Sequence, residues 1–128
     1  MIKYQYIKEV VILSEFSDRE KVNLKKQITQ LNTNFNDIDF IKLFHKLNSL
    51  IKLGHFLSIE SWLLELAITV PIAKGLLALI YLELQDWDKA MNLAGECKVR
   101  FAGTDIWSDI IQTAIWRQFK EPRDTLPT

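Results

Sequence analysis

Apolar residues recur at intervals of three and four along most of this chain, the spacing that places side chains on one face of an α-helix. The Asn-Gly and Asp-Gly pairs that are typical of strand hairpins are absent. The pattern therefore predicts an all-α fold of about seven helices, arranged as antiparallel pairs. β-branched residues in the first segment leave a strand there as an alternative. We expect helices at residues 3–15, 18–31, 37–53, 56–70, 72–84, 86–101 and 105–120.

Polar residues and helix breakers mark the ends of these segments. Ser17 begins a capping box, in which a serine hydroxyl accepts a hydrogen bond from an amide in the first helical turn. Asn36 and Thr104 are expected to cap later helices in the same way. Gly54 suits the left-handed residue that ends a helix, and Pro71 stops the helix that precedes it.

The chain is long enough for one domain with a hydrophobic core. Its 128 residues are 48% hydrophobic and 25% charged, as in ordinary globular proteins. The most apolar stretch is divided by Pro71 and carries three charged residues, which indicates two buried helices and no membrane span. The N-terminus has no signal-peptide pattern, so a cytoplasmic protein is expected. We expect one helical domain at 1–120 (N-terminal helices at 1–36, paired units and a capping helix at 37–120) and a C-terminal tail at 121–128.

Two corner segments of the chain repeat one another. Leu53-Gly54-His55-Phe56 and Leu84-Gln85-Asp86-Trp87 lie 31 residues apart, and each falls between two predicted helices. An apolar residue follows each corner aromatic by three positions, Ile59 in the first segment and Ala90 in the second. Such a period is typical of stacked helix pairs, which bury their apolar faces only against a neighbouring pair.

The second corner resembles a tetratricopeptide (TPR) unit. In that family small residues let the paired helices approach each other, and an aromatic residue at the corner fills the gap between them. The first corner matches less fully, because Leu47 and Ile59 stand where small residues are usual and the period is shorter than the usual length of about 34 residues. An unrelated α-helical bundle is the alternative. The matching positions of the second corner are Ala78, Tyr81, Asp86, Trp87 and Ala90.

Length and layout over residues 40–120 resemble a narrower group, the small TPR-like chaperones of bacterial type III secretion that hold the needle subunit (the YscG type). The best-matching segments are 46–56 and 76–84. The resemblance implies a cytoplasmic bacterial chaperone that holds the amphipathic helix of the needle subunit in an apolar groove and prevents premature polymerisation. A small helical cochaperone would cover the N-terminal region of this hetero-oligomer, here Ile7, Val10 and Val11.

In a TPR the first helix of each unit lines the concave groove, and the alignment of the two corners assigns eight residues to that surface. A groove that clamps a peptide carboxylate would carry Lys, Arg and Asn at such positions. Their aliphatic and aromatic character favours instead the apolar stripe of a partner helix. Each of the eight could alternatively be a core residue. They are Ile41, Phe44, Asn48, Ile51, Ile72, Gly75, Leu79 and Leu82.

Charge and reactive residues narrow the function further. Lys and Arg total 16, as do Asp and Glu, so the neutral chain lacks the charge that nucleic acid or an anionic membrane would attract. His45 and His55 lack the partners of a metal site, and Cys97, with no histidine nearby, is expected to be a buried structural thiol. No phosphate-binding glycine loop occurs. We therefore expect no metal, no cofactor and no enzymatic activity.

Other functions stay open beside the needle-subunit chaperone. A chaperone for translocators or effectors, or a generic TPR adaptor, would be expected to homodimerise or to bind extended peptide. A helix-turn-helix regulator could lie at residues 40–70, but its recognition helix at 58–70 has no Lys or Arg. Trp107 and Trp116 are nine residues apart on the last predicted helix. We expect one of them to cover the end of the core and the other to be exposed for a partner.

Overall fold

The structure, a computed structural model, describes residues 16–120 of the chain. Over these residues the protein is all-α and contains no strand. No helix in this part of the chain is both long enough and apolar enough to cross a bilayer. The predicted helix at 3–15, and with it the total of seven, lies outside the described residues. The helices are α2 (Asp18–Thr33), α3 (Asp37–Leu50), α4 (Phe56–Leu66), α5 (Ala73–Glu83), α6 (Trp87–Arg100) and α7 (Ile106–Lys120), and a wide turn, η1 (Ile51–His55), joins α3 to α4.

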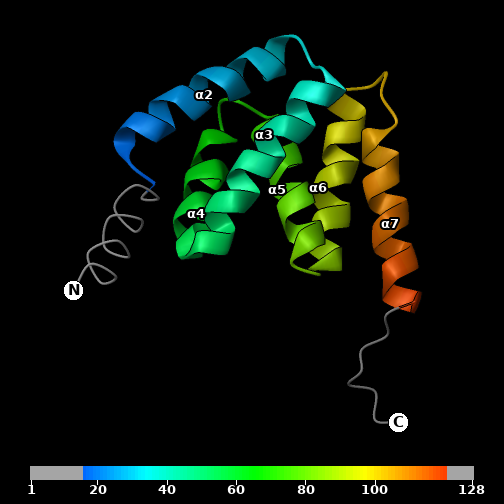
Figure 1. Ribbon diagram of the computed structural model, residues 1–128. Coiled ribbons are helices and arrows are strands. Elements are labelled where there is room, and N and C mark those ends of the chain that lie inside the picture. The colour runs from blue at the N-terminus through cyan, green and yellow to red at the C-terminus, as the bar shows by residue number, and fades with distance from the viewer. Residues whose placement is uncertain (1–15, 121–128) are drawn as a thin grey trace, which may run out of the picture.

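Helix α5 lies at the centre of the arrangement (Figure 1). It packs most extensively against α6, and it also contacts α3, α4 and α7. Most of its residues are buried, which explains why its sequence is apolar around most of the helix circumference. Helices α3, α5 and α7 run broadly in one direction and α4 and α6 in the opposite one, while α2 crosses the end at which α5 begins.

The first two caps form as the sequence predicts. Ser17 Oγ accepts a hydrogen bond from the amide of Glu20 at 3.3 Å. Asn36 Oδ1 accepts one from the amide of Asp39 at 3.0 Å. Each side chain satisfies an amide that has no partner within its own helix, so α2 and α3 begin where these residues stand.

The last helix begins at a cap that also joins distant parts of the chain. Gly103 has a φ of 96°, a left-handed conformation that interrupts the helical backbone between α6 and α7, where the sequence predicts a break between two helices. Thr104 Oγ1 then accepts a hydrogen bond from the amide of Ile106 at 3.2 Å and donates one to Asp37 Oδ1 at 2.7 Å. The predicted cap at Thr104 is confirmed, and through Asp37 it ties the start of α7 to the start of α3.

The two corner segments have matching backbone geometry. Gly54 in the first has a φ of 101°, and Gln85 in the second has a φ of 66°. Both lie in the left-handed region, which few residues other than glycine adopt. The helices that follow begin at Phe56 and at Trp87. The two left-handed turns are therefore 31 residues apart, and so are the helix starts that follow them, as the sequence repeat predicts.

Two helices are shorter than the sequence predicts. α3 ends at Leu50, because the positive φ of Gly54 prevents the last turn from staying α-helical. α4 ends at Leu66, four residues before Val70. The segment that follows is rich in β-branched residues, and the ring of Pro71 disfavours helical backbone at the residue before it.

Candidate partner-binding surfaces

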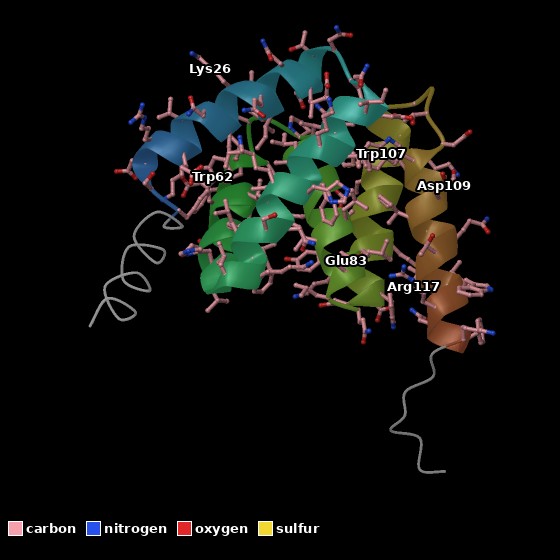
Figure 2. All side chains as sticks on the ribbon, in the orientation of Figure 1. Lys26, Trp62, Glu83, Trp107, Asp109 and Arg117 are labelled. Carbon is pink, nitrogen blue, oxygen red and sulfur yellow. The ribbon has the colours of Figure 1, made fainter. Side chains whose placement is uncertain are left out.

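Trp107, at the start of α7, lies against Gly75 on α5 and is fully buried (Figure 2). Its ring meets that of Phe40 edge-on, with centroids 5.3 Å apart. Phe35 and Phe101 complete an aromatic cluster, and the indole Nε1 donates a hydrogen bond to the carbonyl of Phe101 at 3.0 Å. Helices α3, α5 and α7 form one face, and the cluster fills the end of this face where the three helices begin.

Burial corrects half of the predicted groove. A fully buried side chain offers no surface to a ligand, so four of the eight residues belong to the core, as the alternative interpretation had it. Gly75 illustrates the cause, because its missing side chain admits the protein's own tryptophan and leaves no space for a partner. The buried four are Phe44, Ile72, Gly75 and Leu82. The other four, Ile41, Asn48, Ile51 and Leu79, are half-buried.

Beyond the aromatic cluster the same face carries aliphatic residues, as far as the exposed Glu83 at the end of α5. Leu79 follows Gly75 by four residues on α5, and Ile111 and Ile115 follow Trp107 at intervals of four on α7. Because Trp107 lies against Gly75 and the two helices run in the same direction, these three aliphatic residues share one face. Leu79 and Ile111 pack partly on the core, and Ile115 is 44% exposed. We call Leu79, Ile111 and Ile115 the inner face.

The two isoleucines of the inner face are absent from the groove predicted by the sequence. The two repeated units end before α7 begins, so an alignment of these units assigns no residue of α7 to the groove. The periodic spacing from Trp107 is the signal that identifies them, once Trp107 is known to contact α5.

A second apolar surface is a groove of about 820 Å³ between the end of α4, the start of α5 and the second half of α6. Leu64, Ile68 and Val99 line it, and they are 50%, 81% and 85% exposed. An ion pair between Lys74 Nζ and Glu96 Oε1, 2.7 Å apart, bridges α5 and α6 at its border. We call this surface the α4–α6 groove. The sequence does not predict it, because it depends on how two non-consecutive helices are placed.

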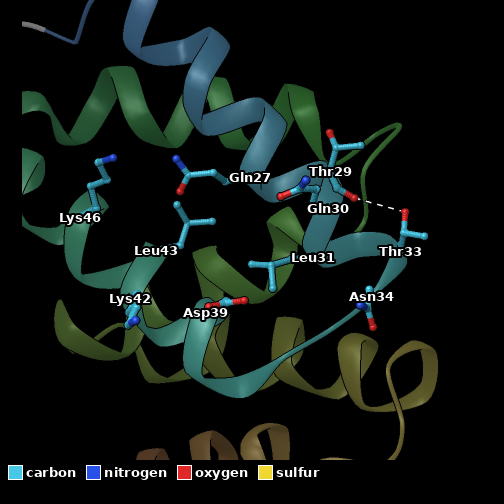
Figure 3. Close-up of a pocket in the computed structure, with 10 residues that line it drawn as sticks. All are labelled: Gln27, Thr29, Gln30, Leu31, Thr33, Asn34, Asp39, Lys42, Leu43 and Lys46. Carbon is cyan, nitrogen blue, oxygen red and sulfur yellow. Dashed lines mark hydrogen bonds between the residues drawn. The ribbon is translucent and has the colours of Figure 1, made fainter.

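A third hollow, of about 900 Å³, lies between α2 and α3, and eight of the ten residues that line it are polar or charged (Figure 3). Gln27 and Gln30 of α2 and Lys42 and Lys46 of α3 are among the residues around it. Within residues 16–120 no buried side-chain nitrogen or oxygen lacks a hydrogen-bond partner. The hollow therefore presents no polar group that is held buried for a ligand.

Comparison with protein-family models, curated proteins and solved structures found no match for this chain. The two apolar surfaces, the inner face and the α4–α6 groove, lie on different sides of α5. Lys74 borders the α4–α6 groove, whereas Leu79 belongs to the inner face. Residues five apart point about 140° away from each other around a helix, so one partner helix cannot occupy both surfaces.

The candidates for chemistry belong to three different elements, α3, η1 and α6. His45 is exposed, His55 is half-buried, and Cys97 is buried. Burial raises the pKa of the Cys97 thiol to about 12, so the thiol stays protonated and unreactive at neutral pH. In the part of the chain that the structure describes, no three His, Cys, Asp or Glu side chains are grouped as a metal site requires.

The two tryptophans of the last helix have different environments. Trp107 is buried at the end of the core, whereas Trp116 is 60% exposed, as the sequence predicts for one of the pair. Lys120 Nζ lies 5.7 Å from the centre of the Trp116 ring, and neighbouring Phe119 is 81% exposed. The residues predicted to contact a cochaperone, Ile7, Val10 and Val11, lie outside the described residues, so that assignment stays a prediction.

Proposed function

We propose that this protein is a TPR-like binding module whose inner face holds the apolar stripe of a partner helix. The proposal is supported by the two corners, which have the same left-handed turn at the same spacing, and by the common direction of α3, α5 and α7. The single observation that carries it is the inner face itself, where Leu79, Ile111 and Ile115 remain accessible beyond the aromatic cluster.

An aliphatic surface of this kind favours a helix over a charged peptide end. The inner-face residues cannot hydrogen-bond a carboxylate, and among the eight residues of the predicted groove only Asn48 has a polar side chain. A helix presents an apolar stripe that such a surface can cover. Each 100 Å² of apolar surface that is buried on binding would contribute about 2.5 kcal/mol before the costs of association and ordering.

Within this class we propose a cytoplasmic bacterial chaperone for the needle subunit of a type III secretion apparatus. Support comes from the resemblance of segments 46–56 and 76–84, which include the first corner and the centre of α5. The chain would act by sequestration, covering a helix that otherwise self-assembles, and would release it at the export machine. A small helical cochaperone would cover the N-terminal region that contains Ile7, Val10 and Val11.

The proposal is tested by isolating the tagged full-length chain from its native host and identifying bound proteins by mass spectrometry. A needle subunit, together with a small helical protein, is the expected result. The purified complex should then delay needle-subunit assembly in light scattering. Recovery of nucleic acid alone, or of a chain without any protein partner, would reject the proposal.

The inner face is tested separately with a variant that changes only its surface. Ile115→Asp places a charge on a residue that is already 44% exposed, so the fold should persist while binding of the needle subunit weakens at least tenfold. Val22→Asp is the matched control, because Val22 is a 61%-exposed aliphatic residue on α2, far from α7. Equal loss of binding in both variants would show that the inner face is not the site.

A further inference from the structure

Helix α4 carries an uncharged stripe on its outer side. Leu57, Ser61, Leu64 and Ile68 follow one another at intervals of four, three and four residues, which places them on one helical face. All four are exposed, the aliphatic ones by 74%, 50% and 81% in chain order. The amide of Ile68 donates to the carbonyl of Glu65 at 3.2 Å, so the helical turn continues to the end of the stripe. We call these four residues the α4 stripe.

We propose that a second copy of this chain covers the α4 stripe, with the two α4 helices antiparallel about a two-fold axis between Ser61 and Leu64. The intervals four, three and four are the same when read from either end, as a two-fold interface requires. The axis sets Leu57 against Ile68 of the other copy and Ser61 against its Leu64. A small residue thus faces a large one at the centre, which lets the two helices approach closely.

The α4–α6 groove completes this interface. Leu64, Ile68 and Val99 stand at its opening, and the axis brings Leu57 of the other copy to that opening. Leu57 and Ile68 are about 16 Å apart along the helix, at 1.5 Å per residue. Each copy therefore offers one projecting leucine at one end of α4 and one groove at the other. In a two-fold pair, the leucine of each copy meets the groove of the other. A second copy of this chain therefore matches the surface at both ends of α4.

The area available is close to what a specific interface needs. Six apolar side chains on each copy would be covered, on the order of 600 Å² at about 100 Å² each. A standard interface buries roughly 800 Å² per partner, so we expect a dimer that dissociates in the micromolar range. α4 and α7 lie on opposite sides of the α5–α6 pair, so the inner face stays open in this dimer. The dimer proposal does not depend on the proposed function. The six are Leu57, Leu64, Ile68, Leu93, Val99 and Phe101.

Sedimentation equilibrium of the full-length chain, from about 1 to about 200 µM, tests the dimer because self-association depends on concentration. We expect a monomer–dimer equilibrium that Leu64→Asp or Ile68→Asp shifts to monomer, with a dissociation constant raised at least tenfold. Val22→Asp should leave the equilibrium unchanged, and circular dichroism should show that all variants fold. A chain that is monomeric throughout, or a dimer that both α4 variants leave intact, would overturn the proposal.

A mixing experiment tests the antiparallel pairing itself. Ser61→Arg sets a cation against Leu64 of the other copy and should weaken the homodimer, as Leu64→Asp does. In a mixed pair, the introduced arginine of one chain faces the introduced aspartate of the other, while the unchanged Ser61 and Leu64 meet at the second position. We therefore expect the two weakened variants to form a dimer when they are combined in equal amounts. Failure of the mixture to dimerise, while the unmodified chain does, would reject this arrangement.

Discussion

The indole of Trp107 lies directly on Gly75. A Cβ atom built on Gly75 would come within 2.5 Å of Cη2 and 2.8 Å of Cζ3 of that ring. The ring is fully buried and is fixed by its hydrogen bond to Phe101, so it has no free space to move into. We therefore expect Gly75→Ala to lower the free energy of unfolding by about 1–3 kcal/mol, measured by urea denaturation.

A second helical glycine provides the control for this experiment. Gly95 lies within α6, and a Cβ there would meet no heavy atom within 4 Å apart from its chain neighbours and the backbone of its own helix. Because alanine favours a helix more than glycine does, Gly95→Ala should raise the free energy of unfolding by roughly 0.5–1 kcal/mol. If both glycine variants changed stability in the same direction, close packing of Trp107 on Gly75 would not be the explanation.

The contact between Trp107 and Gly75 is an example of what the sequence could not predict. The helical segments, the caps at Ser17, Asn36 and Thr104, and the turn at Gly54 depend on local chemistry, and the sequence predicts them. The occupant of the space in front of Gly75 depends on a tryptophan 32 residues later in the chain. No local pattern says whether that space receives a partner or the protein's own ring, so the assignment of Gly75 to a partner-binding groove was wrong.

Gln85 adopts a backbone conformation that glycine would adopt without strain. Its φ is 66°, and its amide donates to the carbonyl of Leu82 while that of Asp86 donates to the carbonyl of Tyr81. These two bonds form a Schellman motif, whose left-handed residue is usually glycine. We expect Gln85→Gly to raise the midpoint of urea denaturation, by an amount equivalent to about 0.5–1 kcal/mol.

The equivalent position in the first corner should respond in the opposite way. Gly54 has a φ of 101° and open space around it, so only the backbone opposes a side chain there. Gly54→Ala should therefore cost about 1–2 kcal/mol. Destabilisation of the chain by Gln85→Gly would argue against a strained turn at the second corner.

Asn32 joins α2 to the connection between α4 and α5. Its Oδ1 accepts a hydrogen bond from the amide of Ile72 at 2.9 Å, across 40 residues of sequence. Ile72 is fully buried, so its amide has little access to water when this acceptor is removed. We expect Asn32→Ala to lower the free energy of unfolding by about 1–3 kcal/mol in urea denaturation. Asn23→Ala, at an exposed position of the same helix, should change it little, and equal losses would rule out a specific role for the bond.

The α4–α6 groove and the inner face show why surfaces are harder to predict than elements. Ile68 and Val99 are apolar residues in helical or near-helical segments, and periodicity alone cannot tell whether they are buried. Both are more than 80% exposed, because α4 and α6 pack on α5 through their other faces. Only the relative placement of helices turns such residues into a surface.

Cys97 should make the fold sensitive to alkaline pH. Burial raises the pKa of its thiol from 9.0 to about 12 in the folded chain. Between these two values the unfolded chain has lost a proton that the folded chain still holds, so the free energy of unfolding falls as pH rises. The stabilisation linked to the Cys97 proton is therefore fully present below pH 9 and is lost by about pH 12. Burial and the hydrogen bond to Glu60 also raise the pKa of Tyr81, which adds to the loss above pH 10.

Replacing each group in turn separates the two contributions. Cys97→Ala should make the free energy of unfolding less dependent on pH from about 9 upward, whereas Tyr81→Phe should do so only above about 10, because an unperturbed tyrosine ionises there. Urea denaturation at several pH values gives both dependences. At neutral pH the thiol of the folded chain should also react with a thiol reagent at least a hundredfold more slowly than in denaturant, since reaction requires the thiolate and access to it. Rapid labelling of the folded chain would show instead that Cys97 is accessible, and the pH dependence would then have to come from Tyr81 alone.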